Sequence, residues 1–411
     1  MTHMKIVRPI TVAAALLTAL AGGTATWLAM ANTDGAPQTV RLNAPGAASS
    51  IVVDERAGHA LVVGDGPHSV LTILDTRDGR VLGAVPLPGH YVGDAAAVAA
   101  RFGHLFVPNT VSSYNNSGSS VDMLDTRTGA FLRAIAVPVG PATVVADDRS
   151  GHVFVASTGA MNPKGGVGGG VVVSMLDARD GATLRHTTVP LVAGTAAMAV
   201  DGMTGRVFVV GYAGNAVVML DTHTGRLLRV VPVGMQPCCV VADEATGRVF
   251  VANEGSNTVS VLDARTGAVL TTSPAGFAAG LAVNPRAGRV VVANGSMTVT
   301  LLDARSGAVL RAVTVGGGPT AVSVDARTGR AVVTGTGNSV SILLHRLGHG
   351  QLAQFGEWRG DYVTVLDTRS GAILRRAHTS STDRIAVDQW TGHVFIADYQ
   401  GNSVHMLDVT R

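Results

Sequence analysis

Residues 261–270 read VLDARTGAVL, and close copies of this phrase recur along most of the chain. In the complete copies, apolar residues lead into an aspartate, a glycine follows four positions later, and a second apolar run leaves the turn. An aspartate can accept hydrogen bonds from nearby backbone N–H groups, and glycine adopts the positive φ that a tight turn requires. The phrase therefore predicts strand, turn, strand. Its aspartates are Asp75, Asp125, Asp177, Asp221, Asp263, Asp303, Asp367 and Asp408.

A second phrase alternates with the first, as in VADEATGRVFVA at residues 241–252. The two phrases together make units of four short strands with a period of about 40–45 residues, which is typical of β-propeller blades. Because the aspartate of the first phrase recurs eight times, we predict an all-β fold, a single β-propeller of eight four-stranded blades. Seven blades are the alternative, because residues 338–344 already resemble a third strand that Asp361–Asp367 repeats.

The last repeat ends before its fourth strand, since the chain stops three residues after Asp408. A matching segment, TVRL at residues 39–42, stands at the other end of the repeats. We therefore predict that the N-terminal strand completes the C-terminal blade and closes the ring. Closure removes the open sheet edges that would otherwise invite aggregation.

Residues 1–31 have a different composition from the repeats. Lys5 and Arg8 precede an apolar run at residues 10–21, and the segment ends in Ala29-Met30-Ala31. A basic start, an apolar run and small residues before a cleavage point are typical of a secretory signal peptide. An uncleaved membrane anchor is the alternative, because residues 10–31 are long enough to span a bilayer. Either way we expect an extracytoplasmic protein: periplasmic, at the cell surface or secreted.

The rest of the chain divides into a linker at residues 32–37 and one propeller domain at residues 38–411. The 31 basic and 28 acidic side chains nearly balance, and most arginines fall in the repeated turns or on the predicted outer strands. We interpret them as a solvated rim, which gives no reason to expect nucleic-acid binding. Membrane contact is expected only if residues 1–31 are not cleaved, and we expect a monomer.

The stretch at residues 249–267, VFVANEGSNTVSVLDARTG, resembles the YVTN family of β-propeller repeats, and weaker copies extend this resemblance over residues 38–411. The resemblance implies a propeller, and it implies a role in binding outside the cytoplasm, because most similar members are extracytoplasmic or surface proteins. Lactonases and haem d1 nitrite reductases use related propellers. A propeller enzyme, either a lactonase-like hydrolase or a quinone- or haem-dependent oxidoreductase, is therefore the alternative function.

The turn phrase also resembles the docking repeat of quinoprotein alcohol dehydrogenases, in which a tryptophan follows the turn. No tryptophan occurs at that position here, so the resemblance does not extend to the way those blades dock. The residues at this position are Gly83, Arg133, Arg185, Arg229, Thr271, Arg311 and Arg375.

Cys238 and Cys239 are adjacent, and the chain contains no other cysteine. An exported protein favours oxidation, so the pair could form a vicinal disulfide. Quinoprotein methanol dehydrogenases carry such a ring against their cofactor. The alternative is a pair of small buried thiols at positions where other repeats have Ala, Thr or Val.

The histidines give no catalytic or metal site. His59, His104, His152 and His393 occupy one position of the repeat, directly after a turn glycine, and we interpret them as structural. His345 lies four residues before His349, but a metal site needs three or four converging ligands. The chain contains no C-x-x-C-H, nucleophile elbow, phosphate loop or H-E-x-x-H motif. We therefore predict no catalytic residue, no metal and no cofactor.

Loop length differs between the two faces of the predicted ring. Turns between strands A and B and between C and D are short, whereas three loops between B and C are long: residues 109–120, 157–170 and 335–361. Insertions on one face of a repeat array usually mark its binding face. All five tyrosines map to the same face: Tyr91 lies in a D–A loop, and Tyr114, Tyr212, Tyr362 and Tyr399 lie in or beside B–C loops. As ligand-binding residues for a small molecule, glycan or protein we predict Tyr91, Tyr114, Tyr212, Trp358, Tyr399 and His345.

Overall fold

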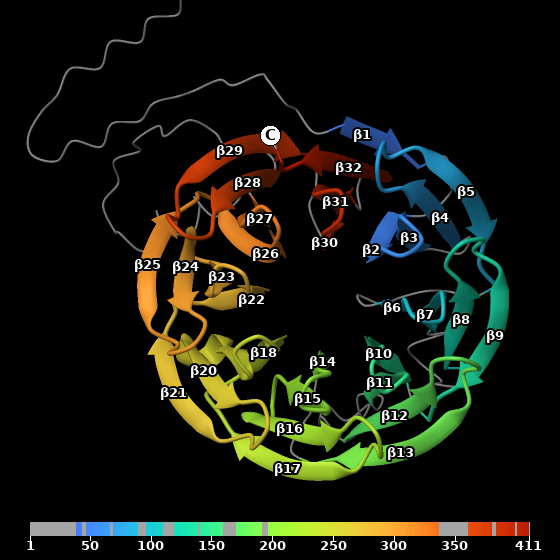
Figure 1. Ribbon diagram of the computed structural model, residues 1–411, viewed down its shortest axis with the longest axis horizontal. Helices are drawn as coiled ribbons and strands as arrows, with labels where there is room; N and C mark the ends of the chain where they lie inside the picture. Colours follow the sequence, from blue (N-terminus) through green and yellow to red (C-terminus); the bar gives the residue numbers. More distant parts are fainter. Residues whose placement is uncertain are drawn as a thin grey trace, which may run out of the picture. The chain divides into compact units, whose positions relative to one another are not determined.

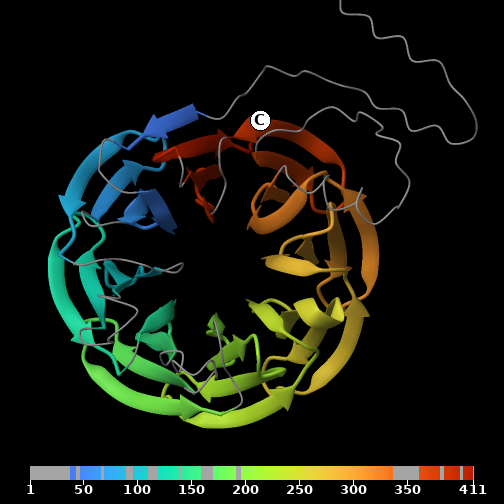
Figure 2. The same ribbon diagram turned by 180° about the vertical axis from the view of Figure 1, so that it is seen from behind.

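The computed structural model describes residues 38–42, 47–65, 69–88, 96–109, 119–138, 140–158, 170–190, 196–336, 361–379, 384–398 and 401–410. These residues belong to one compact unit, Ala36–Arg411. They form eight antiparallel sheets of four strands, arranged around a ring axis (Figure 1). In each sheet, strand A is nearest the axis and strand D is outermost (Figures 1 and 2). The predicted leader and linker lie outside the described residues.

Each blade follows the order A, B, C, D. Blade 1 is β2 (Ala47–Asp54), β3 (His59–Asp65), β4 (Val70–Asp75) and β5 (Val81–Pro86); blade 2 is β6 (Ala97–Ala99), β7 (His104–Asn109), β8 (Ser120–Asp125) and β9 (Phe131–Ala136). Blade 3 is β10 (Pro141–Asp147), β11 (His152–Thr158), β12 (Val171–Asp177) and β13 (Thr183–Val189); blade 4 is β14 (Ala196–Asp201), β15 (Arg206–Gly211), β16 (Ala216–Asp221) and β17 (Leu227–Pro232).

Blade 5 is β18 (Pro237–Asp243), β19 (Arg248–Asn253), β20 (Thr258–Asp263) and β21 (Val269–Pro274), with the one-turn helix η1 (Glu254–Ser256) between β19 and β20. Blade 6 is β22 (Ala278–Asn284), β23 (Arg289–Asn294), β24 (Thr298–Asp303) and β25 (Val309–Thr314). Blade 7 is β26 (Gly318–Asp325), β27 (Arg330–Thr336), β28 (Asp361–Asp367) and β29 (Ile373–Thr379); blade 8 is β30 (Arg384–Val387), β31 (His393–Asp398), β32 (Ser403–Asp408) and β1 (Gln38–Arg41).

The prediction of eight blades is confirmed, and the alternative of seven is wrong. Strand C of blade 7 is β28, while residues 338–344 lie outside the described residues. The predicted closure is also confirmed. β1 pairs with β32 in antiparallel register from Gln38 with Met406 to Arg41 with Ser403. The first described strand of the chain therefore completes the last blade.

Strands B and C make up the core, because both of their faces are covered. The phenylalanine of strand B is fully buried in blades 4 and 5, as Phe208 and Phe250. Phe208 packs in one cluster with Val249 and Val251 of the next blade, so the apolar core lies between blades as well as within them. Burial at these interfaces is the main force that holds the ring together.

The turn phrase folds as its residues predict. Oδ1 of Asp263 accepts hydrogen bonds from the backbone N–H and the hydroxyl of Thr266, both at 2.9 Å. Gly267 has a φ of 72°, in the left-handed region that favours glycine. The Thr266 N–H is the main reason that the pKa of the Asp263 carboxyl lies below its usual value. The repeated aspartates are therefore turn caps.

Blades 5 and 6 share a polar pair inside the blade. Nδ2 of Asn253, at the end of strand B, donates to Oγ of Ser260 on strand C at 2.9 Å. Asn294 and Thr300 make the same bond in blade 6 at 2.8 Å. Buried polar groups need such partners. In blade 2 the partner of the equivalent Asn109 is the Asp122 carboxylate, at 3.0 Å.

The interpretation of the outer-strand arginines as a solvated rim needs a correction. Arg133 Nη1 of blade 2 donates to the Asp180 carbonyl in the C–D turn of blade 3, at 2.9 Å. Arg229 makes the equivalent bond to Thr266 at 2.8 Å. These arginines occupy the position of the tryptophan in the alcohol dehydrogenase repeat. They fasten one blade to the next by a hydrogen bond to a turn carbonyl, although their side chains are exposed to solvent.

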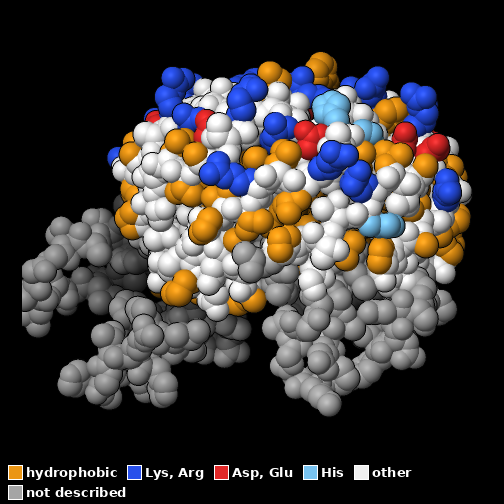
Figure 3. All heavy atoms as spheres, turned by 90° about the horizontal axis from the view of Figure 1, so that it is seen from below, with side chains coloured by type: hydrophobic (Ala, Val, Ile, Leu, Met, Phe, Trp, Pro, Cys, Tyr) orange, Lys and Arg blue, Asp and Glu red, His pale blue; other side chains and the backbone are white. Residues whose placement is uncertain are grey.

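Two faces of the ring can now be defined. The turn face carries the A–B and C–D turns, and the loop face carries the B–C and D–A connections. Arginine side chains gather on one edge of the ring in the side view (Figure 3), as expected from the arginines in the A–B and C–D turns. The turn face therefore carries many arginines beside the repeated aspartates.

Candidate functional site

Three large apolar side chains stand exposed on the loop face of blades 4 to 6. Tyr212, after β15, is 39% exposed; Met235, after β17, is 55% exposed; and Phe277, after β21, is 45% exposed. They come from three of the four loop-face connections between β15 and β22, so they lie along one stretch of the ring. Exposed aromatic and methionine side chains are enriched where proteins bind partners.

Hydrogen bonds between the connections fix this stretch of the face. The Gln236 N–H donates to Oδ1 of Asn215, three residues after Tyr212, at 2.9 Å. The Met235 N–H donates to Oγ of Ser256 in η1 at 3.1 Å, and the Gly255 N–H donates back to the Met235 carbonyl at 3.0 Å. The connection before β18 therefore bridges blades 4 and 5 in one conformation.

Phe277 is held in a similar way over blade 6. Its carbonyl accepts the Gly295 N–H at 2.8 Å, and its ring lies so close to Gly295 that a Cβ there would be 2.7 Å away. Only glycine fits beneath this ring. The side chain is thus positioned before any partner binds, which lowers the entropy lost on binding.

The residues predicted from the sequence meet different outcomes. Tyr212 lies exposed on the loop face. Tyr362 lies within β28 with only 7% of its surface exposed, and this burial raises the pKa of its hydroxyl, so it is a core residue and not part of a binding surface. Five predicted residues lie outside the described residues, and their role stays a prediction: Tyr91, Tyr114, Trp358, Tyr399 and His345.

Met235 and Phe277 were missed, because the search of the sequence followed tyrosine and the longest loops. Their signal was a large apolar residue next to glycine between two predicted strands, in Gly234-Met235 and Gly276-Phe277. A core side chain would fall within a strand phrase, whereas these two fall between phrases.

Cys238 and Cys239 open β18, directly after the Met235 connection, and both are thiols in the structure. Cys238 Sγ lies 3.2 Å from the carbonyl of Ala278 and Cys239 Sγ lies 3.3 Å from that of Ala279, both on the first strand of blade 6. A hydrogen bond between the two thiols raises the pKa of Cys238 and lowers the pKa of Cys239. Burial opposes the lowering at Cys239. Their contacts fit small half-buried thiols at a blade interface, and the vicinal disulfide stays a prediction.

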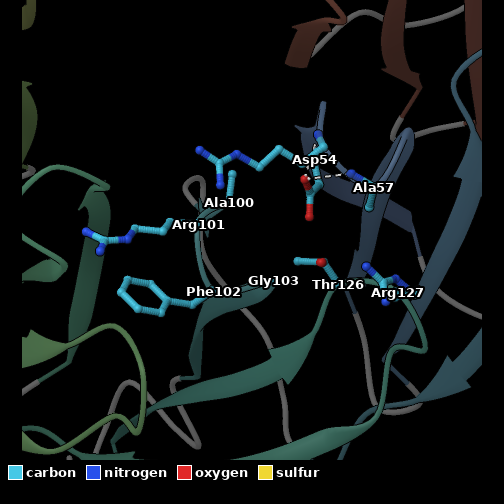
Figure 4. Close-up of a pocket in the computed structure, with 9 residues that line it drawn as sticks. Asp54, Ala57, Ala100, Arg101, Phe102, Gly103, Thr126 and Arg127 are labelled. Atoms are coloured by element: carbon cyan, nitrogen blue, oxygen red, sulfur yellow. Dashed lines mark hydrogen bonds between the residues drawn. The ribbon is translucent and has the colours of Figure 1, made fainter.

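A cavity of about 260 Å³ opens on the turn face between blades 1 and 2. Asp54 and Thr126 lie between Arg101 with Phe102 on one side and Arg127 on the other (Figure 4). Arg56 also lines it. The sequence interpretation gave these arginines no binding role, since the turn face is built from similar repeats.

Within the part of the chain that the structure describes, no group of three or more His, Cys, Asp or Glu side chains could hold a metal ion. No helix among the described residues has the length and apolar character needed to span a membrane.

Comparison with known proteins adds to this geometry. A family model described as "Outer membrane protein assembly factor BamB" matches residues 168–410. The crystal structure of BamB from Moraxella catarrhalis superposes with a TM-score of 0.60 at 16% identity, covering 91% of this chain and 99% of that chain. Saccharomyces cerevisiae Sqt1 gives a TM-score of 0.69 at 11% identity, with the same coverage of 91% and 99%.

Hydrazine synthase from Kuenenia stuttgartiensis gives a TM-score of 0.56 at 15% identity, covering 90% of this chain and 97% of that chain. At identities this low, likeness to solved structures shows the fold alone, and the fold is shared by proteins of different function. No curated protein matches the chain at the sequence level.

Proposed function

The chain belongs to the family described as the outer membrane protein assembly factor BamB, and we propose that it is an exported scaffold that binds a partner protein through its loop face. The family match and the fold place it in the quinoprotein-like propeller superfamily. Membership of the narrower YVTN family remains our interpretation of the repeats.

The observation that carries this proposal is the exposed row of Tyr212, Met235 and Phe277. Each side chain is between 39% and 55% exposed, on connections fixed by hydrogen bonds between blades 4, 5 and 6. A row spread over three blades suits the surface of another protein better than a small molecule. The description of the family as an assembly factor also supports a partner protein rather than a small molecule.

Export is the second part of the proposal. It is supported by the basic, apolar and small-residue pattern of residues 1–31 and by the family description. We expect the mature chain to begin at Asn32, and mass spectrometry of the protein from fractionated source cells tests this. A protein that keeps Met1 and stays with the cytoplasmic fraction would contradict export.

The loop face is tested by placing a photo-crosslinking amino acid at Phe277 or Tyr212 in the full-length protein, expressed in its own cells. Leu310 on the outer strand β25 is the matched control, because its exposed fraction of 48% is close to the 45% of Phe277. We expect a discrete protein adduct at both loop-face positions and none at Leu310. Equal adducts at all three positions, or none at the loop face, would contradict the proposal.

Affinity for the crosslinked partner then tests the side chains themselves. Changing Tyr212, Met235 and Phe277 singly to Ser should weaken binding by about 1–3 kcal/mol at each true anchor. The fold should be unaffected because all three side chains are already exposed, and thermal unfolding checks this. Full affinity in all three variants would place the interface elsewhere.

A further inference from the structure

The third residue of the A–B turn is an arginine or a tryptophan on six successive blades of the ring. Blades 6, 7, 8, 1, 2 and 3 have Arg286, Arg327, Trp390, Arg56, Arg101 and Arg149 there. Trp390 is 83% exposed, and the five arginines are exposed as well. We call these six residues the turn-face arc. Arginine and tryptophan are among the residue types enriched at positions that dominate binding energy.

Contacts between neighbouring turns hold most of the arc in place. The Ala326 N–H donates to Oε1 of Gln389 at 2.8 Å, and the Gln389 N–H donates to Oε1 of Glu55 at 3.1 Å. Further round, the Arg101 N–H is shared between both carboxylate oxygens of Asp148, each at 3.2 Å. The turns of blades 7, 8 and 1 are thus linked in series, and those of blades 2 and 3 are linked to each other.

The cavity between blades 1 and 2 lies within this arc. Arg56, Arg101 and Arg127 all line it, and Phe102 forms part of its wall. The Arg101 guanidinium carbon lies 5.4 Å from the centre of the Phe102 ring. A guanidinium stacked on a ring can still donate hydrogen bonds from the N–H groups in its own plane. The guanidinium groups of Arg56 and Arg127 have no hydrogen-bond or ion-pair partner among the described residues. Three cations with unused donors therefore surround about 260 Å³ of space.

The nearby carboxylates do not neutralise these arginines. Oδ1 of Asp54, which also lines the cavity, accepts the backbone N–H groups of Arg56 and Ala57 at 3.0 and 3.1 Å. Asp148 is bonded to the Arg101 backbone in the same way. The lining holds three guanidinium groups against one carboxylate, Asp54, so the cavity wall keeps a net positive charge.

We propose that the turn-face arc binds an acidic polypeptide segment, with one carboxylate in the cavity among Arg56, Arg101 and Arg127 and an apolar side chain against Trp390. Guanidinium groups bind carboxylates through two parallel hydrogen bonds. The cavity alone would suit a small anion. The arc, however, continues past the cavity to Trp390 and Arg327 on one side and Arg149 on the other, which favours an extended chain. This site is independent of the loop-face function proposed above.

The test uses the full mature chain and a fluorescent peptide of about ten residues that alternates Glu with Leu. We expect saturable binding by anisotropy, and a change in tryptophan emission that is lost in Trp390→Ala. A variant with Arg56→Glu and Arg101→Glu should lose at least about tenfold in affinity. The matched control changes Arg265 and Arg305 to Glu, because these arginines lie in the C–D turns of the same face, towards the rim, and the change in net charge is equal. It should stay within about twofold of the wild type.

Three results would overturn the proposal. Equal loss of affinity in both double variants would show general attraction to a basic surface. Equal binding of the peptide with Gln in place of Glu would remove the role of the carboxylates. Displacement of the peptide by free glutamate or inorganic phosphate at the same molar concentration would show a site for a small anion only.

Discussion

Two arcs of the ring use the same repeat position differently. In blades 8, 1, 2 and 3, the residue after the A–B turn glycine is histidine, and its Nδ1 bonds a carbonyl of the next blade. The pairs are His393 with Thr76 at 2.6 Å, His59 with Thr126 at 3.1 Å, His104 with Ala178 at 2.9 Å and His152 with Thr222 at 2.7 Å. We call these four blades the histidine arc.

In blades 4, 5 and 6, the arginine arc, the same position is arginine, and the side chain turns back within its own blade. Arg206, Arg248 and Arg289 lie 3.0, 3.2 and 3.6 Å from carboxylate oxygens of Asp221, Asp263 and Asp303. In these three blades the guanidinium bonds the carboxylate of its own C–D turn, whereas Arg330 at the same position of blade 7 donates to the Val409 carbonyl of blade 8, as the histidines donate to their neighbours. Equivalent positions in a repeat can therefore stabilise either the interface between blades or the blade itself.

The difference between the arcs matters most at the seam where the ring closes. Blade 8 belongs to the histidine arc, and its outer strand β1 is held by four register pairs with β32. Behind the strand, Oγ1 of Thr39 lies 3.1 Å from Nδ1 of His405, and His405 Nε2 lies 3.5 Å from Oδ2 of Asp398. Side-chain contacts thus fasten the two ends of the domain together, in addition to the backbone ladder.

The largest effect is expected from removing this strand. A chain that begins at Gly46 should leave the edge of β32 unpaired and lower the melting temperature by about 10 °C or more, with aggregation. Differential scanning calorimetry and light scattering measure both. Removing only residues 32–37 is the control and should change little. Equal melting of the shorter chain and the full mature chain would contradict a stabilising role for closure.

The next largest effect is expected inside the seam. Asp398 has no exposed surface, so His405→Leu removes a polar neighbour of a buried carboxylate and should cost about 1–3 kcal/mol in the free energy of unfolding. Asp398→Asn combined with His405→Thr recreates the Asn294–Thr300 pair of blade 6 and should recover most of that loss. Urea unfolding measures both variants. A double variant as unstable as His405→Leu would contradict the equivalence of these pairs.

The architecture could be predicted from the sequence because it repeats. Seven of the eight repeated aspartates have a glycine four positions later, which predicted the turns, and the short segment at residues 39–42 predicted the closing strand. The contacts between blades were not predictable in the same way. At the same repeat position Arg248 bonds its own blade while Arg330 reaches the next one, so the residue type alone does not tell which contact forms.

The candidate site was predicted less well for a related reason. Tyr212 was found, but Met235 and Phe277 are exposed only because their connections cross above the sheet, and hydrophobic residues in a sequence are more often buried. Tyr362, which was not among the predicted ligand-binding residues, borders a long insertion, yet it is the second residue of β28 and packs over Gly335. Proximity in sequence to a variable loop did not indicate exposure.

A smaller effect compares the arcs directly. His152→Ala removes a bond between blades and should lower the free energy of unfolding by about 1 kcal/mol. Arg248→Ala removes an ion pair that is partly exposed, with side chains 25% and 30% exposed, and should cost about 0.5 kcal/mol. Arg265→Ala, in a C–D turn, serves as the control with no expected change. An equal or larger cost for Arg248→Ala would contradict the greater weight given to contacts between blades.

The smallest effect concerns the turn caps that both arcs share. The pKa of Asp263 is lowered in the folded protein, chiefly by the Thr266 N–H, so its contribution to stability is present above the unfolded pKa and is lost as pH falls through the folded value. Asp263→Asn should therefore cost about 0.5 kcal/mol at pH 7 and nothing near pH 2, as measured by urea unfolding at each pH.

The pKa of Asp125, in the histidine arc, is lowered too, because the hydrogen bonds from Thr128 and Arg127 outweigh burial. Asp125→Asn should therefore follow the same course with pH. The costs of the two substitutions should differ in 1 M salt, because Asp263 forms an ion pair with Arg248 and Asp125 forms no ion pair with a described residue. Salt should reduce the cost of Asp263→Asn more than that of Asp125→Asn, and equal reductions would show that the ion pairs of the arginine arc add nothing to the caps.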